Sequence, residues 1–222
     1  MKNSTSTLLM IFTLETRPVI KFSGLLAGLL IIALLFSGCG LTKTYVQINY
    51  THRAAAQTIS GSGAVKVKVD VQDQRTIKDH IGRKGDEYSF LGLIIATNDV
   101  AEVITKAIET EVVQRGFRLG AGQLQIIVTL HKFFADYKKD VFTERIVGEV
   151  IMEVQVKKTD GSILFAKAIT AEGSEMGGLL RNGNDSKHAL EKALDRAISK
   201  LVDDSAFLQS LMITADAPPF EK

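Results

Sequence analysis

The sequence predicts an α+β fold, in which two long amphipathic helices pack on one face of a mainly antiparallel sheet. Several stretches alternate apolar and polar residues, and this pattern is typical of strands with one buried face. Two other segments repeat apolar residues at helical spacing. Three of the predicted strands follow one another without a helix between them, so they can form an antiparallel meander whose second face is open to solvent.

The N-terminal segment has the layout of a bacterial export signal. Residues 22–36, FSGLLAGLLIIALLF, carry no charge and directly follow Lys21. Cations, a short apolar run and then small residues are typical of a signal peptide, and an apolar run of about fifteen residues is short for a span of about twenty. We therefore predict a signal peptide over residues 1–38, with Met1 or Met10 as the start, in preference to a permanent transmembrane helix.

Cys39 is the only cysteine in the chain and directly follows Phe36, Ser37 and Gly38. The residues FSGC resemble a lipobox, the site at which bacterial lipoproteins are acylated and cut, although leucine is more usual at the position of Phe36. The resemblance implies that Cys39 becomes the first residue and carries a diacylglyceryl group and a further acyl chain such as palmitate. Two lipid chains suffice for stable anchoring.

Two features around Cys39 support lipidation and indicate the membrane that holds the protein. A lone cysteine has no partner for an intramolecular disulfide, and a purely buried thiol is a poor explanation beside a cleavage pattern. Gly40 follows it, where an aspartate would favour retention in the inner membrane of a Gram-negative cell. We therefore expect a lipid-anchored protein on the periplasmic face of the outer membrane.

Cleavage would change the composition of the chain. It leaves 184 of the 222 residues, and it removes three of the 27 cations and one of the 25 anions, which leaves 24 of each. A balanced charge argues against nucleic-acid binding, and this length suits one domain. We expect a lipidated N-terminus with a first strand and a linker over residues 39–62, a periplasmic α+β domain over 63–213, and a flexible tail over 214–222.

The first half of the domain contains two predicted strands and a helix. Residues 45–50, YVQINY, and the valine-rich residues 65–73 alternate as strands do. A helix is expected up to Gln114, capped by Asn98 or Asp99 and ended by Gly116 in a left-handed conformation. Before that cap lies SFLGLIIA, residues 89–96, which is apolar where a loop would be polar. It forms core or a short strand, or alternatively a partner surface.

The second half contains the meander and the last helices. Strands are expected over residues 124–137, 144–158 and 162–176, with Thr159-Asp160-Gly161 as the turn between the last two. Residues 177–185 are expected to form a flexible loop. Ser186 is expected to cap a long helix with an apolar stripe to Leu201, and residues 205–212 to form a short last helix.

Three stretches carry a resemblance to a known family. VKVDVQDQRT, AIETEVVQRGF and GQLQIIVTLHKFFADY resemble the YajG-type lipoproteins of Gram-negative bacteria, through the valine strand that ends in Asp73-Gln74-Arg75 and the helix that ends in Arg115-Gly116-Phe117. With the leader and ALDRAISKLVDDSAF, the resemblance covers most of the mature chain, although residues 138–183 match only in strand pattern. It implies an outer-membrane lipoprotein with a periplasmic α+β domain, and it supplies no catalytic residue.

The residues that carry chemistry do not form a catalytic pattern. His52, His80, His131 and His188 are scattered and lack metal-ligand spacing, so we expect surface or strand-edge residues and no metal site. Asp70 and Asp73 are expected to be an outward strand residue and a turn residue rather than an acid–base pair. Arg75 is expected to fix the corner after the strand by a local charge-assisted hydrogen bond to Asp73. We therefore expect neither an enzyme nor a cofactor.

Two function classes follow. The first is a non-enzymatic interaction or assembly component of the cell envelope, which binds a protein partner or a second copy of itself through the open sheet face, a sheet edge or residues 89–96. The alternative is a carrier that holds a lipid or glycan in a groove between helices and sheet, near the apolar and glycine-rich residues 89–96 and 177–180.

Overall fold

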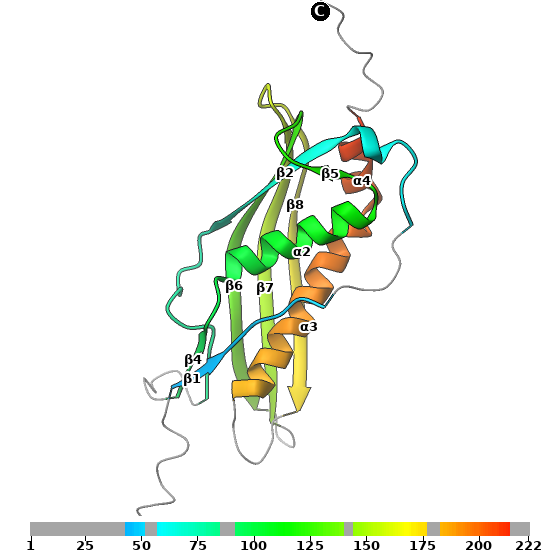
Figure 1. Ribbon diagram of the computed structural model, residues 1–222. Coiled ribbons are helices and arrows are strands. Elements are labelled where there is room, and N and C mark those ends of the chain that lie inside the picture. The colour runs from blue at the N-terminus through cyan, green and yellow to red at the C-terminus, as the bar shows by residue number, and fades with distance from the viewer. Residues whose placement is uncertain (1–42, 52–56, 85–91, 140–143, 177–182, 214–222) are drawn as a thin grey trace, which may run out of the picture. The chain divides into compact units, whose positions relative to one another are not determined.

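The computed structural model describes residues 43–51, 57–84, 92–139, 144–176 and 183–213. In these ranges, eight strands form one sheet, and the helices lie on one of its faces (Figure 1). The strands are β1 (Thr44–Val46), β2 (Lys66–Asp73), β3 (Gly82–Arg83), β4 (Leu93–Ala96), β5 (Arg118–Leu119), β6 (Leu124–Lys139), β7 (Glu144–Lys158) and β8 (Ile163–Met176). The helices are the 3-10 turn η1 (Ser62–Ala64), α2 (Val100–Gln114), α3 (Gly183–Val202) and α4 (Ser205–Met212).

The long strands β6, β7 and β8 form the predicted antiparallel meander. Their bounds agree closely with the sequence pattern, and the turn between β7 and β8 contains Gly161 with a φ of 89°. A bulge between Leu130 and Lys132 shifts the alternation of β6 by one residue. Leu130 faces the core before the bulge and Phe133 faces it afterwards, and both are buried.

The expectation of a mainly antiparallel sheet was met only in part, because the sheet is mixed. β2 runs parallel to β6 over seven residue pairs from Val67↔Leu124 to Asp73↔Leu130, and β1–β4, β2–β5 and β3–β6 are also parallel. The reason lies in the connection between β2 and β6, which contains α2. A helical crossover returns the chain to the same end of the sheet, so the next strand enters parallel to the first.

Helix α2 has the predicted boundaries. The Asp99 side chain accepts hydrogen bonds from the backbone N–H groups of Ala101 and Glu102, so Asp99, and not Asn98, is the cap. At the other end Gly116 has a φ of 95°, and a Cβ there would lie 2.2 Å from Ser62 Oγ. The glycine is therefore needed both for the left-handed turn and for close contact with η1.

Helix α3 starts earlier than predicted, and α4 is present as expected. The described part of α3 begins at Gly183, so residues 183–185 are helical rather than loop, and residues 177–182 of the expected loop lie outside the described residues. Ser186 is buried inside the helix and its Oγ has no hydrogen-bond partner among the described residues, so the predicted cap was wrong. Besides the two long helices, α4 adds a third, shorter one that is capped by Asp204.

Small residues let α3 approach the sheet closely. Ala135, Gly148 and Gly173 lie opposite one another across β6, β7 and β8. A Cβ at Gly148 would lie 2.6 Å from the backbone of Ala189 on α3, and one at Gly173 would lie 2.2 Å from the Ala189 carbonyl oxygen. This row therefore sets the depth at which the helix sits on the sheet.

The first predicted strand is shorter than its sequence pattern. β1 ends at Val46, where residues 45–50 were expected to form a strand. Beyond it, the backbone of Ile48 exchanges two hydrogen bonds with the side chain of Asn98, at 3.0 Å to Oδ1 and 2.7 Å from Nδ2. An amide side chain thus satisfies the backbone groups that a neighbouring strand would otherwise have paired.

The apolar stretch before α2 is built into the sheet. Residues 93–96 form β4, which pairs with β1 and β3, and Ile94 is fully buried. This confirms the core or short-strand interpretation for that part, whereas residues 89–91 lie outside the described residues. None of the helices in the described ranges is long and apolar enough to cross a membrane.

Candidate functional site

A pocket of about 520 Å³ lies on the sheet face opposite the helices. Lys132, Phe134 and Asp136 of β6 point to this face, because they alternate with Phe133 and Ala135, which are buried in the helix-side core. The other walls come from the loop after β2, from β3 and from β7. The pocket is lined by Arg75, Thr76, Ile77, Arg83, His131, Lys132, Phe133, Phe134, Asp136 and Ile151.

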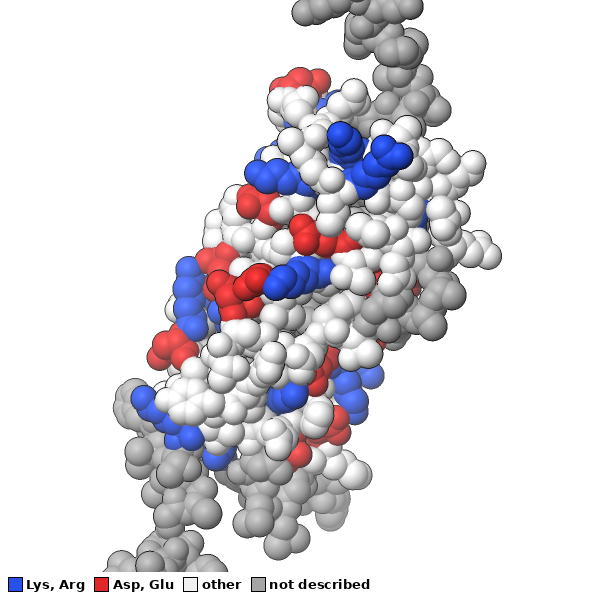
Figure 2. All heavy atoms as spheres, in the orientation of Figure 1, with Lys and Arg blue, Asp and Glu red and all other residues white. Residues whose placement is uncertain are grey.

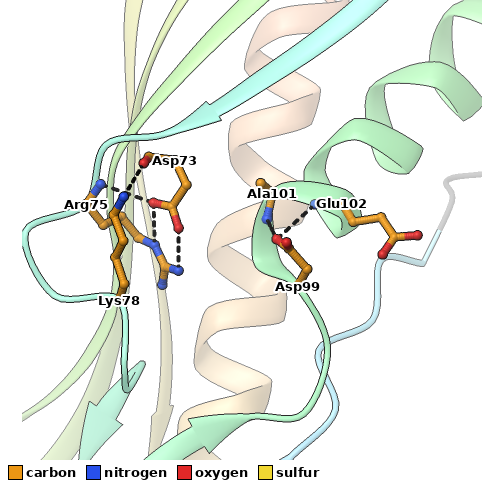
Figure 3. Close-up of polar contacts among 6 residues, drawn as sticks. All are labelled: Asp73, Arg75, Lys78, Asp99, Ala101 and Glu102. Atoms are coloured by element: carbon orange, nitrogen blue, oxygen red, sulfur yellow. Dashed lines mark hydrogen bonds and ion pairs between the residues drawn. The ribbon is translucent and has the colours of Figure 1, made fainter.

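One wall of the pocket is fixed by the ion pair between Asp73 and Arg75 (Figure 3). Arg75 donates from Nε to Asp73 Oδ1 at 2.9 Å, from Nη2 to Oδ2 at 2.8 Å, and from its backbone N–H to Oδ1 at 3.1 Å. Lys78 Nζ also donates to the Asp73 carbonyl oxygen at 2.6 Å. The predicted local hydrogen bond at this corner is confirmed, and its two-point form is the strong geometry for arginine and carboxylate.

The arginine is mostly removed from solvent while one of its nitrogens is unused. The Arg75 side chain is 6% exposed, and Nη1, on the side away from Asp73, is buried without a hydrogen-bond partner among the described residues (Figure 3). A buried donor without a partner costs about 1–3 kcal/mol. The hydrogen bond from the Arg75 side chain is the main cause that lowers the pKa of Asp73 below the ordinary aspartate value.

The Phe134 ring lines the pocket and lies in contact with Arg83 and His80. The Arg83 guanidinium carbon lies 5.6 Å from the centroid of the Phe134 ring, a cation–π contact. The His80 ring meets the same ring edge-on at 5.6 Å. Arg83 Nε donates to His80 Nε2 at 3.4 Å, and the other ring nitrogen, Nδ1, lies 2.9 Å from Asp79 Oδ1. His80 is therefore buried rather than on the surface, which corrects the expectation for this residue.

The remaining wall is polar and lies on β6. Lys132 Nζ contacts Glu149 Oε2 across the β6–β7 pair at 2.5 Å. His131 and Asp136 are exposed, as was expected for His131. Among the side chains that line the pocket, three are cationic (Arg75, Arg83 and Lys132) and one is a carboxylate (Asp136). The pocket therefore combines an apolar floor with a mainly cationic wall.

The opposite, helix-bearing face has a different character. Figure 2 shows Lys and Arg intermixed with Asp and Glu over most of that side. Lys106 and Glu102 on α2, for example, form an exposed ion pair at 2.6 Å. A mixed surface of this kind is typical of a solvated face.

The free edge of β8 is capped by side chains of α3. Lys192, Arg196 and Lys200 donate to the carbonyl oxygens of Ser174, Glu172 and Thr170, at 3.4, 2.6 and 2.7 Å. The three cations are spaced four residues apart on α3, a rise of about 6 Å, and their acceptors are spaced two residues apart on β8, a rise of about 6.7 Å. Because the two spacings nearly match and the helix runs antiparallel to the strand, each cation reaches one carbonyl group. Cations at an edge oppose pairing with another strand, so this edge is poorly suited to strand addition.

A second charged cluster lies at the end of α2 and was not predicted. Arg115 Nη1 donates to Glu111 Oε2 at 2.7 Å, and Tyr50 Oη donates to Glu111 Oε1 at 2.6 Å. Ser62 Oγ donates to the Arg115 carbonyl oxygen at 2.9 Å. The cluster ties residues that precede β2 to the C-terminus of α2, and we interpret it as structural because its charges are matched internally.

The other candidate residues are placed as follows. Cys39 and His52 lie outside the described residues, and His188 is exposed on α3. Asp70 is half-buried on β2 and accepts a hydrogen bond from Gln72 at 3.4 Å, which confirms it as an outward strand residue. In the part of the chain that the structure describes, no group of three His, Cys, Asp or Glu side chains is arranged to hold a metal ion.

The groove predicted between helices and sheet is filled where the structure describes it. Ile104, Ile108 and Val112 of α2 and Leu190 and Leu194 of α3 are fully buried in one core with the sheet. Residues 177–180, the other expected part of the groove, lie outside the described residues. Hydrophobic periodicity predicted these helix faces, but it gave no signal for a pocket on the opposite side of the sheet.

Comparison with known proteins identifies the family. Residues 52–212 match the sequence profile of a family described as uncharacterised lipoprotein. The chain belongs to this lipoprotein family. The resemblance is thereby supported at the level of an uncharacterised lipoprotein family, and the narrower YajG-type assignment stays a prediction. No curated protein matches the chain.

One solved structure supports the fold of this family member. A crystal structure from Xanthomonas campestris aligns with a TM-score of 0.51 at 13% identity and covers 72% of this chain and 92% of its own. A minor lipoprotein from Acinetobacter baumannii aligns with a TM-score of 0.43 at 8% identity and covers 65% of this chain and 94% of its own. At such identities the first of these likenesses speaks for the fold alone.

Proposed function

We propose that this lipoprotein is a non-enzymatic binding component of the cell envelope, anchored through Cys39 on the periplasmic face of the outer membrane. Its family membership supports an envelope lipoprotein, and the FSGC motif and Gly40 support the anchor and its membrane. The partner docks on the sheet face that the helices leave open, where the pocket between Arg75, Arg83, Lys132 and Phe134 lies.

The single observation that carries the docking site is this pocket. Recognition sites are concave and mostly apolar, with a few polar groups that fix the orientation of the bound molecule. The Phe134 ring is held between Arg83 and His80, and the Asp73–Arg75 pair fixes the adjoining loop, so the surface is arranged before any partner arrives. Pre-arranged arginine and aromatic side chains are the residue types most often found at the energetic centre of an interface.

Other surfaces fit this role less well. The cations of α3 occupy the carbonyl groups along the β8 edge, and the described part of residues 89–96 is committed to β4. The helix-bearing face carries a mixed set of charges with ion pairs of its own. The open face offers a partner a recess, an aromatic ring and three cationic side chains together.

Site-specific photo-crosslinking in living cells tests the proposal. A photoreactive amino acid replaces the exposed His131 at the pocket, and in a matched strain it replaces the exposed Lys106 on α2. We expect one recurrent adduct from position 131 that is absent from position 106 and is lost in Cys39→Ala. Equal adducts from both positions would contradict the docking site, and an adduct that survives Cys39→Ala would contradict the need for the anchor.

The carrier hypothesis makes a different prediction for the same protein. A carrier purified from its own membranes retains a lipid or glycan, which native mass spectrometry detects as a defined added mass. Apolar side chains fill the described helix–sheet core, and the pocket on the open face is one place where such a ligand would fit. A retained small molecule together with no protein adduct at position 131 would favour the carrier.

A further inference from the structure

We infer that the pocket on the open sheet face recognises a single oxyanion, a carboxylate or a phosphate group, attached to a small apolar or aromatic body. This inference deepens the proposed function, on which it rests, by naming the chemical class of group that the partner presents. It is carried by the charges of the pocket wall, by the geometry around Phe134 and by the unused donors of Arg75 and Lys132.

The wall supplies more positive than negative groups. Arg75, Arg83 and Lys132 reach it from three separate elements, and Asp136 is the one carboxylate among the lining side chains. Asp73 and Glu149 are already occupied by Arg75 and Lys132. Arg75 and Lys132 are in turn paired with these carboxylates, so an incoming anion is held by the N–H donors that remain on them rather than by an excess of charge.

Donor capacity remains on two of these cations. A guanidinium has five N–H donors, and the Arg75 nitrogen Nη1 has no partner among the described residues. A lysine ammonium has three donors, and Lys132 uses one of them on Glu149. Carboxylate and phosphate are the groups that accept several such donors at once, and the planar fork of arginine fits them closely.

The floor determines what carries the anion. Phe134 and Ile151 lie beside the cationic wall, and Arg83 already lies over the Phe134 ring at 5.6 Å. A pocket of about 520 Å³ falls within the usual range of roughly 300–1,000 Å³ for small-molecule sites. A ring or a short aliphatic chain that bears one terminal anion matches both features.

Nuclear magnetic resonance titration of the full-length protein, purified from membranes, tests the inference with three probes. Phenylacetate carries a carboxylate, phenyl phosphate carries a phosphate, and phenylacetamide has nearly the same shape as phenylacetate without charge. We expect saturable shifts of the backbone amides of Thr76, Lys132 and Phe134 with both anions, and binding at least about tenfold weaker for the amide. The anion with the lower dissociation constant indicates whether the natural partner presents a carboxylate or a phosphate.

Charge-removing variants supply the controls. Arg83→Gln and Lys132→Gln leave the Asp73–Arg75 corner in place, and each should weaken anion binding about tenfold. Lys106→Gln removes the same charge from α2 and should leave the affinity unchanged. If Arg83→Gln disturbs the fold through its contact with His80, Lys132→Gln still tests the inference, because its partner Glu149 lies at the partly exposed rim.

Three results would overturn the inference. They are the absence of saturable shifts with either anion, equal binding of phenylacetamide and phenylacetate, or an effect of Lys106→Gln as large as that of Lys132→Gln. Failure here is distinguishable from failure of the proposed function. If a crosslinked adduct forms at position 131 but no anion binds, the docking site stands and the oxyanion inference fails. If the anions bind but no adduct forms, the oxyanion site stands and the proposal of an envelope partner fails.

Discussion

Arg75 is bound to Asp73 by two side-chain hydrogen bonds and one backbone hydrogen bond, although only one residue separates them in the chain. This contact turns the end of β2 into a rigid corner and holds one wall of the pocket in place (Figure 3). It also leaves a largely buried guanidinium that depends on a single carboxylate. Stability and recognition are therefore coupled at this corner.

We expect Asp73→Asn to destabilise the protein by about 2 kcal/mol at pH 7, because a hydrogen bond to a charged group contributes roughly 1.5–3 kcal/mol. The pKa of Asp73 is lowered in the folded protein, chiefly by the hydrogen bond from Arg75. Its contribution is therefore fully present above the ordinary carboxyl pKa of about 4, and it is lost as the pH falls through the lowered value.

Urea denaturation as a function of pH checks this prediction. The difference in unfolding free energy between the wild-type protein and Asp73→Asn should shrink steadily below about pH 4. Asp70→Asn on the same strand is a suitable control, because the Asp70 side chain accepts only one long hydrogen bond among the described residues, from Gln72 at 3.4 Å. A difference that stays constant down to pH 2 would mean that the Asp73–Arg75 ion pair does not contribute to stability.

Gly148→Ala and Gly173→Ala should each destabilise the fold by about 1–3 kcal/mol, because added methyl groups overpack a tight contact. Each Cβ would meet the backbone of α3 at 2.6 Å or less. Gly63→Ala is the control, since its nearest neighbour would lie at 3.9 Å. Thermal unfolding followed by circular dichroism measures the change, and a Gly173→Ala protein as stable as Gly63→Ala would show that α3 can shift away from the sheet.

Replacing Lys192, Arg196 and Lys200 together by serine should promote self-association. The change removes the three cations that bind the edge carbonyl groups of β8, and an uncovered strand edge is a template for pairing. Analytical ultracentrifugation at increasing concentration should detect the association. A variant with Lys43, Lys66 and Lys106 changed to serine loses the same charge elsewhere, and equal association of both would point to net charge rather than to the edge.

Asp99→Ala should cost about 1 kcal/mol of unfolding free energy, because the first backbone N–H groups of α2 would lose their acceptor. Asp99→Ser should restore most of that loss, since serine also accepts as an N-cap. Guanidinium denaturation of the three proteins is the measurement. If Asp99→Ala and the wild-type protein unfold at the same denaturant concentration, water or another side chain replaces the cap.

Cys39→Ala should move the protein from the membrane fraction to the soluble fraction, because the predicted lipid chains attach at this residue. Intact mass spectrometry of the wild-type protein should give the mass of residues 39–222 plus the acyl groups. Gly40→Asp tests the membrane assignment, since we expect it to shift the protein towards the inner membrane in a density gradient. A wild-type protein that retains residues 1–38 would contradict processing at this site.

Local patterns in the sequence determined the elements. Alternation of valines predicted β2, helical spacing predicted α2 and α3, and turn chemistry predicted the hairpin at Gly161, because each depends on residues that are near one another in the chain. The Asp73–Arg75 contact could be predicted for the same reason, since the two residues are only two positions apart in the chain. Family membership likewise follows from the chain itself.

Only the tertiary structure decided which strands lie beside one another and which side chains form the pocket. The helix between β2 and β6 was predicted, but the parallel pairing of these two strands depends on where that helix packs. The pocket brings together Arg83, Phe134 and Lys132 because β3 and β6 are neighbours in the sheet. The cations of α3 reach the edge of β8 because the helix packs beside that strand. Such long-range contacts depend on which elements pack together, and this information is not contained in any local period of the sequence.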